Sequence, residues 1–160
     1  MSIRTGLVRR LGMTTTNLLT DPAFRTYALT CAILGVQMLL IALWTGTIRT
    51  LRKEWVNSED AQFNKAKLTE VEHPDVARIK RAHVNAIENA IPFVVIGGLY
   101  VLVAHPSATA AAIYLWTFAA VRILHTVFYL AYRQPFRTIT FGIGVLCTFG
   151  MAFHVIKAVV

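Results

Sequence analysis

Four long stretches of the chain contain almost no charged residues. They cover residues 26–48, 83–105, 108–132 and 138–156. At 1.5 Å per residue, the first stretch alone would form a helix of roughly 33 Å, which is enough to cross a hydrocarbon core of about 30 Å. The pattern therefore predicts four transmembrane helices.

We expect an all-α integral membrane protein, with a four-helix transmembrane bundle over residues 25–160 and a basic N-terminal segment over 1–24. The composition agrees, because 56% of the 160 residues are hydrophobic, only 15% are charged and the mean hydropathy is +0.55. Such values exclude a disordered, collagen-like or coiled-coil chain. Residues 1–20 lack the apolar core of a cleaved signal peptide, so we expect a frayed terminus there.

The chain is basic, with 16 Lys and Arg against eight Asp and Glu, a net charge of +8 and a pI near 10.0. In a soluble protein this excess would suggest nucleic-acid binding. Here the basic residues lie between apolar runs, and ten of them fall in the loops 49–81 and 133–137 against five on the side of the termini. The positive-inside rule then predicts that these loops are cytoplasmic, in a bacterial inner membrane or the endoplasmic reticulum, and that nucleic acid is no partner.

Two helices carry polar residues on one face, where the spacing of three, four and three positions aligns them. The residues are Arg78, Arg81, Asn85 and Glu88 on the second helix, and Arg122, His125, Tyr129 and Tyr132 on the third. A charge at mid-membrane costs roughly 2.5–3.5 kcal/mol on insertion scales, so such groups normally face a bundle interior or a wet cavity. Arg49 and Arg137, at the ends of their helices, belong to the same side.

These groups predict a ligand with several anionic groups and one cation, held at the cytoplasmic edge of the bilayer. Guanidinium groups bind carboxylates through two parallel hydrogen bonds, and Glu88 suits an ammonium group. Glutathione has two carboxylates, an ammonium group and a thiol. Two alternatives stay open: Glu88 and Arg122 would form a purely structural ion pair, or His83 and His125 would bind a haem. The cysteines show no zinc-ligand spacing, so we expect no metal site.

Three segments resemble the MAPEG family, the membrane-associated proteins in eicosanoid and glutathione metabolism. They are RIKRAHVNAIENAIPF (78–93), VRILHTVFYL (121–130) and QPFRT (134–138). The likeness is greatest to the microsomal glutathione transferase and microsomal prostaglandin E synthase branches. It implies a homotrimer of four-helix subunits that binds glutathione between neighbours. The family's glutathione-contacting positions fall on Arg49, Arg81, Asn85, Glu88, His125, Tyr129, Arg137 and Thr138.

The resemblance also implies a mechanism, in which Arg137 stabilises the glutathione thiolate for attack on a lipophilic electrophile. Thr138, at a serine position of the family, would orient the sulfur, and Asp60 would assist Arg137 as proposed in the prostaglandin synthase branch. The same thiolate would suit a peroxidase or a prostaglandin-type isomerase, and the fold family includes a non-catalytic lipid-binding member. Ala77, Val84 and Phe141 depart from the family's glutamate, arginine and tyrosine, and the lost phenol argues against synthase chemistry.

Overall fold

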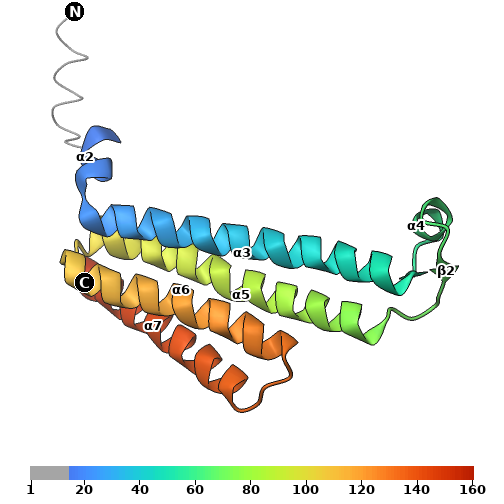
Figure 1. The fold of residues 1–160 in the computed structure, drawn as a ribbon. Helices are drawn as coiled ribbons and strands as arrows, with labels where there is room; N and C mark the ends of the chain where they lie inside the picture. The colour runs from blue at the N-terminus through green and yellow to red at the C-terminus, as the bar shows by residue number, and fades with distance from the viewer. Residues whose placement is uncertain (1–14) are drawn as a thin grey trace, which may run out of the picture.

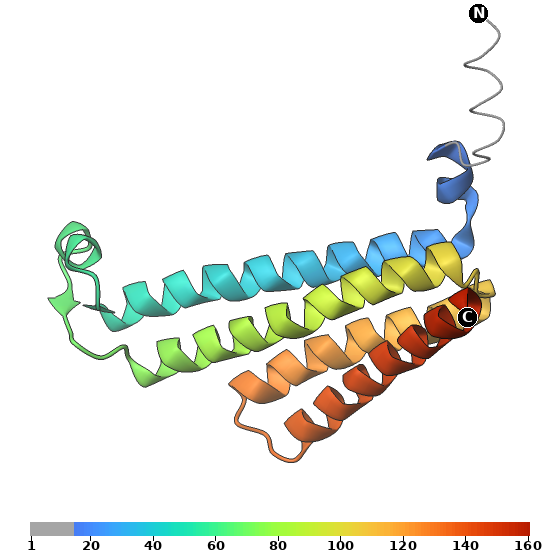
Figure 2. The same ribbon diagram turned by 180° about the vertical axis from the view of Figure 1, so that it is seen from behind.

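The computed structural model describes residues 15–160, so most of the expected basic segment, residues 1–14, lies outside the described residues. Four long helices run lengthwise beside one another (Figures 1 and 2). They are α3 (Pro22–Arg52), α5 (Pro74–Val103), α6 (Ala108–Leu130) and α7 (Phe136–Val159), preceded by the short α2 (Thr15–Thr20). Each of the four is long and apolar enough to cross a membrane, which confirms the predicted fold class.

The helices extend beyond the uncharged stretches because capping groups, rather than hydrophobicity, set their ends. Asp21 Oδ1 accepts a hydrogen bond from the Ala23 amide at 2.9 Å and starts α3. His73 Nδ1 accepts from the Asp75 amide at 3.2 Å at the start of α5. The predicted second stretch, 83–105, therefore leaves out the first turns of α5, which are polar and carry much of the site described below.

A short structured segment connects α3 to α5 at one tip of the molecule (Figure 1). It contains β1 (Glu54–Trp55), α4 (Ser58–Phe63) and β2 (Lys67–Leu68), and the two strands pair in parallel. The sequence pattern does not predict these strands, because two residues leave no alternation to detect. Both ribbon views show α3 and α5 reaching further toward this tip than α6 and α7, whose connection is set back.

The core lies where all four helices meet. Phe93 of α5 stacks on Phe118 of α6 with ring centroids 3.9 Å apart, and both side chains are buried with Leu115 and Met151. In contrast, the outer surface is strongly apolar, as at Leu43, which is 69% exposed. A soluble monomer rarely exposes so many large apolar side chains, so lipid or neighbouring protein covers this surface.

Candidate functional site

An open groove of about 550 Å³ lies along the loop end of α5. Its lining residues are Glu72, Ala77, Lys80, Arg81, Val84, Asn85, Glu88 and Tyr129. Four predicted site residues thus come together here, three from α5 and Tyr129 from α6. Arg81 and Glu88 are exposed, whereas Asn85 is half-buried. The groove therefore presents cations, a carboxylate and an amide side by side, as a ligand of mixed charge requires.

Tyr129 connects this groove to the first turn of α7. The Arg137 guanidinium carbon lies 4.7 Å from the centre of the Tyr129 ring, within the range of a cation–π contact. On the other side, the ring of His125 lies 5.8 Å from that of Tyr129, and His125 itself is buried. The structure consequently brings Arg137 and His125 to Tyr129, one of the residues that line the groove.

Gln134 holds the two residues expected to act on sulfur. Because a guanidinium group only donates, the Gln134 amide oxygen faces Arg137 and accepts from Nη2 at 2.7 Å and from Nε at 3.3 Å. The Gln134 amide nitrogen then donates to Thr138 Oγ1 at 3.1 Å. The Thr138 hydroxyl proton consequently remains available for a ligand. The role of Gln134 is not predicted from the sequence, although the residue lies in the QPFRT segment.

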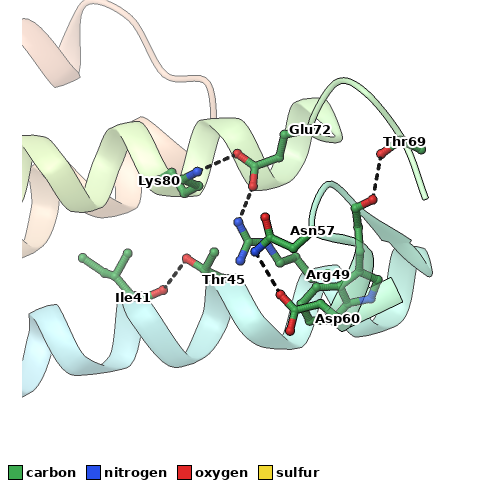
Figure 3. A network of polar contacts seen from close by, with 9 residues as sticks. Ile41, Thr45, Arg49, Asn57, Asp60, Thr69, Glu72 and Lys80 are labelled. Carbon is green, nitrogen blue, oxygen red and sulfur yellow. Dashed lines mark hydrogen bonds and ion pairs between the residues drawn. The ribbon is translucent and has the colours of Figure 1, made fainter. Parts of the chain in front are cut away.

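Arg49 lies at the edge of the groove and binds Glu72, which no sequence pattern marks as part of a site (Figure 3). Lys80 Nζ lies 3.0 Å from the other oxygen of the same carboxylate, and the Arg49 guanidinium lies 5.7 Å from the centre of the Trp55 ring. Burial by itself would raise the pKa of the Glu72 carboxyl, but hydrogen bonds and charges from Arg49 and Lys80 outweigh it and lower that pKa. Glu72 thus ties the ends of α3 and α5 together.

The lowered pKa of Glu72 predicts a pH-dependent contribution to stability. Because the pKa is lower in the folded protein, the contribution is complete above the unfolded pKa of about 4.3 and is lost as the pH falls through the folded pKa. We expect Glu72→Gln to lower the melting temperature by about 2–4 °C at pH 7 and by less at pH 3. Thermal unfolding in detergent at both pH values measures this.

Asp75→Asn is the matched control, since Asp75 pairs with Arg52 at 2.5 Å on a more exposed surface. An exposed pair contributes little to stability, so this variant should melt within about 1 °C of the wild type. Equal melting temperatures for Glu72→Gln and the wild type at pH 7 would contradict the role given to Glu72.

Asp60 lies in α4, where its carboxylate accepts a hydrogen bond from Asn57 Nδ2 at 3.1 Å (Figure 3). Across residues 15–160 no hydrogen bond or ion pair joins it to Arg137. The ribbon views place α4 at the tip of the molecule, away from the connection between α6 and α7. Within one chain, the structure does not bring Asp60 to the other predicted catalytic residues.

The alternative of a structural ion pair between Glu88 and Arg122 is not formed in the described part of the chain. Arg122 is buried and donates instead to Asn85, whereas Glu88 remains exposed in the groove.

Arg78, from the same polar face, donates to the Tyr129 carbonyl oxygen at 3.1 Å and stacks 3.4 Å from the Tyr132 ring centre. Arg78 therefore holds the backbone of Tyr129 in place, while the Glu88 carboxylate is exposed to a ligand in the groove.

Four helices that can cross a membrane, with a groove of mixed charge at one end, define an integral membrane protein with a candidate binding site. The sequence model of the MAPEG family matches residues 27–157, and the chain belongs to this family. It is 35% identical to microsomal glutathione S-transferase 1 of Homo sapiens over 148 residues, which are 89% of this chain and 95% of that protein. It is 36% identical to the Rattus norvegicus protein over 141 residues, covering 85% and 88%. Prostaglandin E synthase of Homo sapiens is 31% identical over 139 residues, covering 86% and 91%.

Proposed function

We propose that this protein is a membrane-bound glutathione transferase, which activates the thiolate of glutathione for attack on lipophilic electrophiles. The observation that carries the proposal is the convergence of three helices on one site. Arg81, Asn85 and Glu88 of α5 share the groove with Tyr129 of α6, and Arg137 of α7 lies over the Tyr129 ring. Relatives named as microsomal glutathione S-transferase over nearly the whole chain support the same activity.

The charges of the groove fit glutathione as the bound molecule. Glu88 pairs with the ammonium group, while Lys80 and Arg81 provide cations for the carboxylates. A volume of about 550 Å³ lies within the range of small-molecule sites. Arg49, which binds the groove residue Glu72, and His125, whose ring lies next to that of Tyr129, complete the proposed binding set.

In the proposed reaction, Arg137 favours the anionic form of the glutathione sulfur. A free thiol has a pKa near 8.5, and a guanidinium group beside it lowers that pKa and raises the fraction of thiolate at neutral pH. The Thr138 hydroxyl donates a hydrogen bond that orients the sulfur. The thiolate then forms a bond to carbon of the electrophile and a halide leaves, while the protein supplies position and charge and forms no covalent bond.

The assembly that we propose is a homotrimer, in which neighbouring subunits cover the exposed side of the groove. Its loops 49–81 and 133–137 face the cytoplasm, in either a bacterial inner membrane or the endoplasmic reticulum. If Asp60 assists Arg137, it does so from a neighbouring subunit, because the two residues do not meet within one chain. The electrophile enters from the lipid, since the apolar outer surface adjoins the site.

A prostaglandin-type isomerase is the second candidate, supported by the 31% identity to prostaglandin E synthase. Phe141 is the observation against it. Its ring lies 6.2 Å from that of His125, beside the proposed glutathione site, and has no hydroxyl to donate. A non-catalytic lipid-binding role, which the fold family includes, is the third alternative. It is disfavoured because it would give the charged side chains of the groove no ligand.

The direct experiment is an activity screen of the purified protein in detergent or nanodiscs. We expect conjugation of glutathione to a chlorinated nitrobenzene and binding of radiolabelled glutathione, with lipid hydroperoxide and prostaglandin endoperoxide as parallel substrates. Turnover of the endoperoxide alone would favour the isomerase. Absence of glutathione binding by folded protein would overturn the proposal.

A further inference from the structure

A buried arginine inside the bundle contacts the groove only through one of its lining residues. Arg122 is 3% exposed, and its Nη2 donates to Asn85 Oδ1 at 2.6 Å and to the Asn85 carbonyl oxygen at 3.2 Å. Asn85 lines the groove, whereas Arg122 does not. Among the described residues, the hydrogen bonds of the Arg122 guanidinium group go to Asn85, so Asn85 is its hydrogen-bonded link to the groove.

The contact determines which end of the Asn85 amide faces the groove. A guanidinium group has donors and no acceptor, so the amide oxygen must face Arg122 and the amide nitrogen must face away. In the described part of the chain Asn85 Nδ2 has no hydrogen-bond partner. Asn85 thus presents two N–H donors to a ligand, while its acceptor is occupied.

Three other helices hold Arg122 in this position. Gln37 of α3 donates through Nε2 to the Arg122 carbonyl oxygen at 3.2 Å and to Thr126 Oγ1 at 2.7 Å. Gly144 of α7 lies beside the Arg122 side chain, where an added Cβ would be 3.4 Å from Arg122 Cδ. Because Arg122 is buried among these helices and its carbonyl oxygen is bonded to Gln37, its guanidinium group has little room to follow a rotating Asn85 amide.

We propose that Arg122 is a positioning residue that makes Asn85 selective for a carboxylate of the bound ligand. The inference rests on the proposed function, in that glutathione is the ligand. With Arg122 present, Asn85 turns its two N–H donors to the ligand, which both oxygens of a carboxylate can accept, whereas a carboxamide offers one oxygen and sets its own N–H group against these donors. Without Arg122, the Asn85 amide is free to rotate and to accept from such an N–H group.

The test compares glutathione with its two monoamides, in which either the glycine carboxylate or the glutamyl α-carboxylate is a carboxamide. Dissociation constants, kcat and KM are measured for the wild type and for Arg122→Met. One of the two monoamides carries its carboxamide at the group that Asn85 contacts. We expect the dissociation constant of the wild type for this monoamide to be about tenfold higher than for glutathione. In Arg122→Met this preference falls to about twofold or less, the preference over the other analogue persists, and kcat at saturating glutathione is unchanged.

Thr30→Val is the matched control, because it removes a buried hydrogen bond of α3 that involves neither Arg122 nor Asn85. If Arg122 had only a structural role, both variants would have lower melting temperatures, and both would keep the preference for glutathione over each monoamide. That result would overturn the proposal. Adding Arg122→Met to Asn85→Ala should cause no further loss of preference. An additional loss in the double variant would equally contradict action through Asn85.

Asn85→Asp keeps the inference testable if Arg122→Met does not fold, because the new carboxylate retains the contact with Arg122. It replaces the N–H donors in the groove by an acceptor, so the preference should reverse toward the carboxamide analogue. An unchanged preference would overturn the inference. Failure of wild-type protein to bind glutathione at all would instead overturn the proposed function.

Discussion

Replacing Arg137 by alanine should lower kcat for conjugation of a chlorinated nitrobenzene by about 10² or more at pH 7, the scale of removing one anion-stabilising donor. The reason is electrostatic. Without the guanidinium group, the pKa of the glutathione thiol returns toward its free value of about 8.5, and the thiolate fraction at neutral pH falls. The pH–rate profile should therefore shift to higher pH, with part of the lost rate recovered in alkaline buffer. Steady-state kinetics from pH 6 to about 9.5 measure both effects.

Arg133→Ala is the matched control for this prediction. It removes the same charge four residues earlier, from the connection between α6 and α7, but Arg133 is exposed and its side chain makes no hydrogen bond, ion pair or ring contact within residues 15–160. We expect kcat within about twofold of the wild type for this variant. An Arg137→Ala protein that binds glutathione and turns over at the wild-type rate would remove Arg137 from the mechanism.

Replacing Glu88 by glutamine should raise KM for glutathione by about ten- to a hundredfold, because a hydrogen bond between charged partners in the groove is lost. The turnover number should change little, since the ammonium group of glutathione is remote from sulfur and is bound equally in the ground and transition states. Initial rates at varied glutathione concentration, with saturating electrophile, separate the two parameters.

A glutathione analogue without its amino group tests the pairing of Glu88 directly. The wild type should bind this analogue weakly, and Glu88→Gln should bind it no worse than the wild type does. Glu70→Gln, in the exposed connection before α5 and outside the groove, should leave KM for glutathione unchanged. If the variant lost the same affinity for glutathione and for the analogue, Glu88 would not be the ammonium partner.

The four-helix fold is predictable from the sequence because a long uncharged run has few alternatives to a membrane-spanning helix. The ends of the helices are less predictable, since Asp21 and His73 act through local capping bonds rather than through hydrophobicity. For the same reason the uncharged stretch that begins at residue 83 does not mark the start of the second helix, and α5 begins at Pro74.

The polar faces of α5 and α6 are predictable because helical periodicity places Asn85 with Glu88 and His125 with Tyr129. What periodicity does not give is the partner of each group. Arg122 binds Asn85 rather than Glu88, since burial directs its guanidinium group to a neutral acceptor inside the bundle. Glu72 and Gln134 lie in connections between helices, where no repeating pattern marks a side chain as part of a site.

The proposed stabilisation of the glutathione thiolate is tested most directly by measuring the ionisation of glutathione bound to the wild-type protein. Thiolate absorbs in the near ultraviolet and the neutral thiol does not, so a difference spectrum titrated against pH gives the pKa of the bound sulfur. We predict a thiolate band at pH 7, with a pKa at least about one unit below the 8.5 of a free thiol. Saturating glutathione that binds without a thiolate band until the pH reaches that of the free thiol would contradict the account.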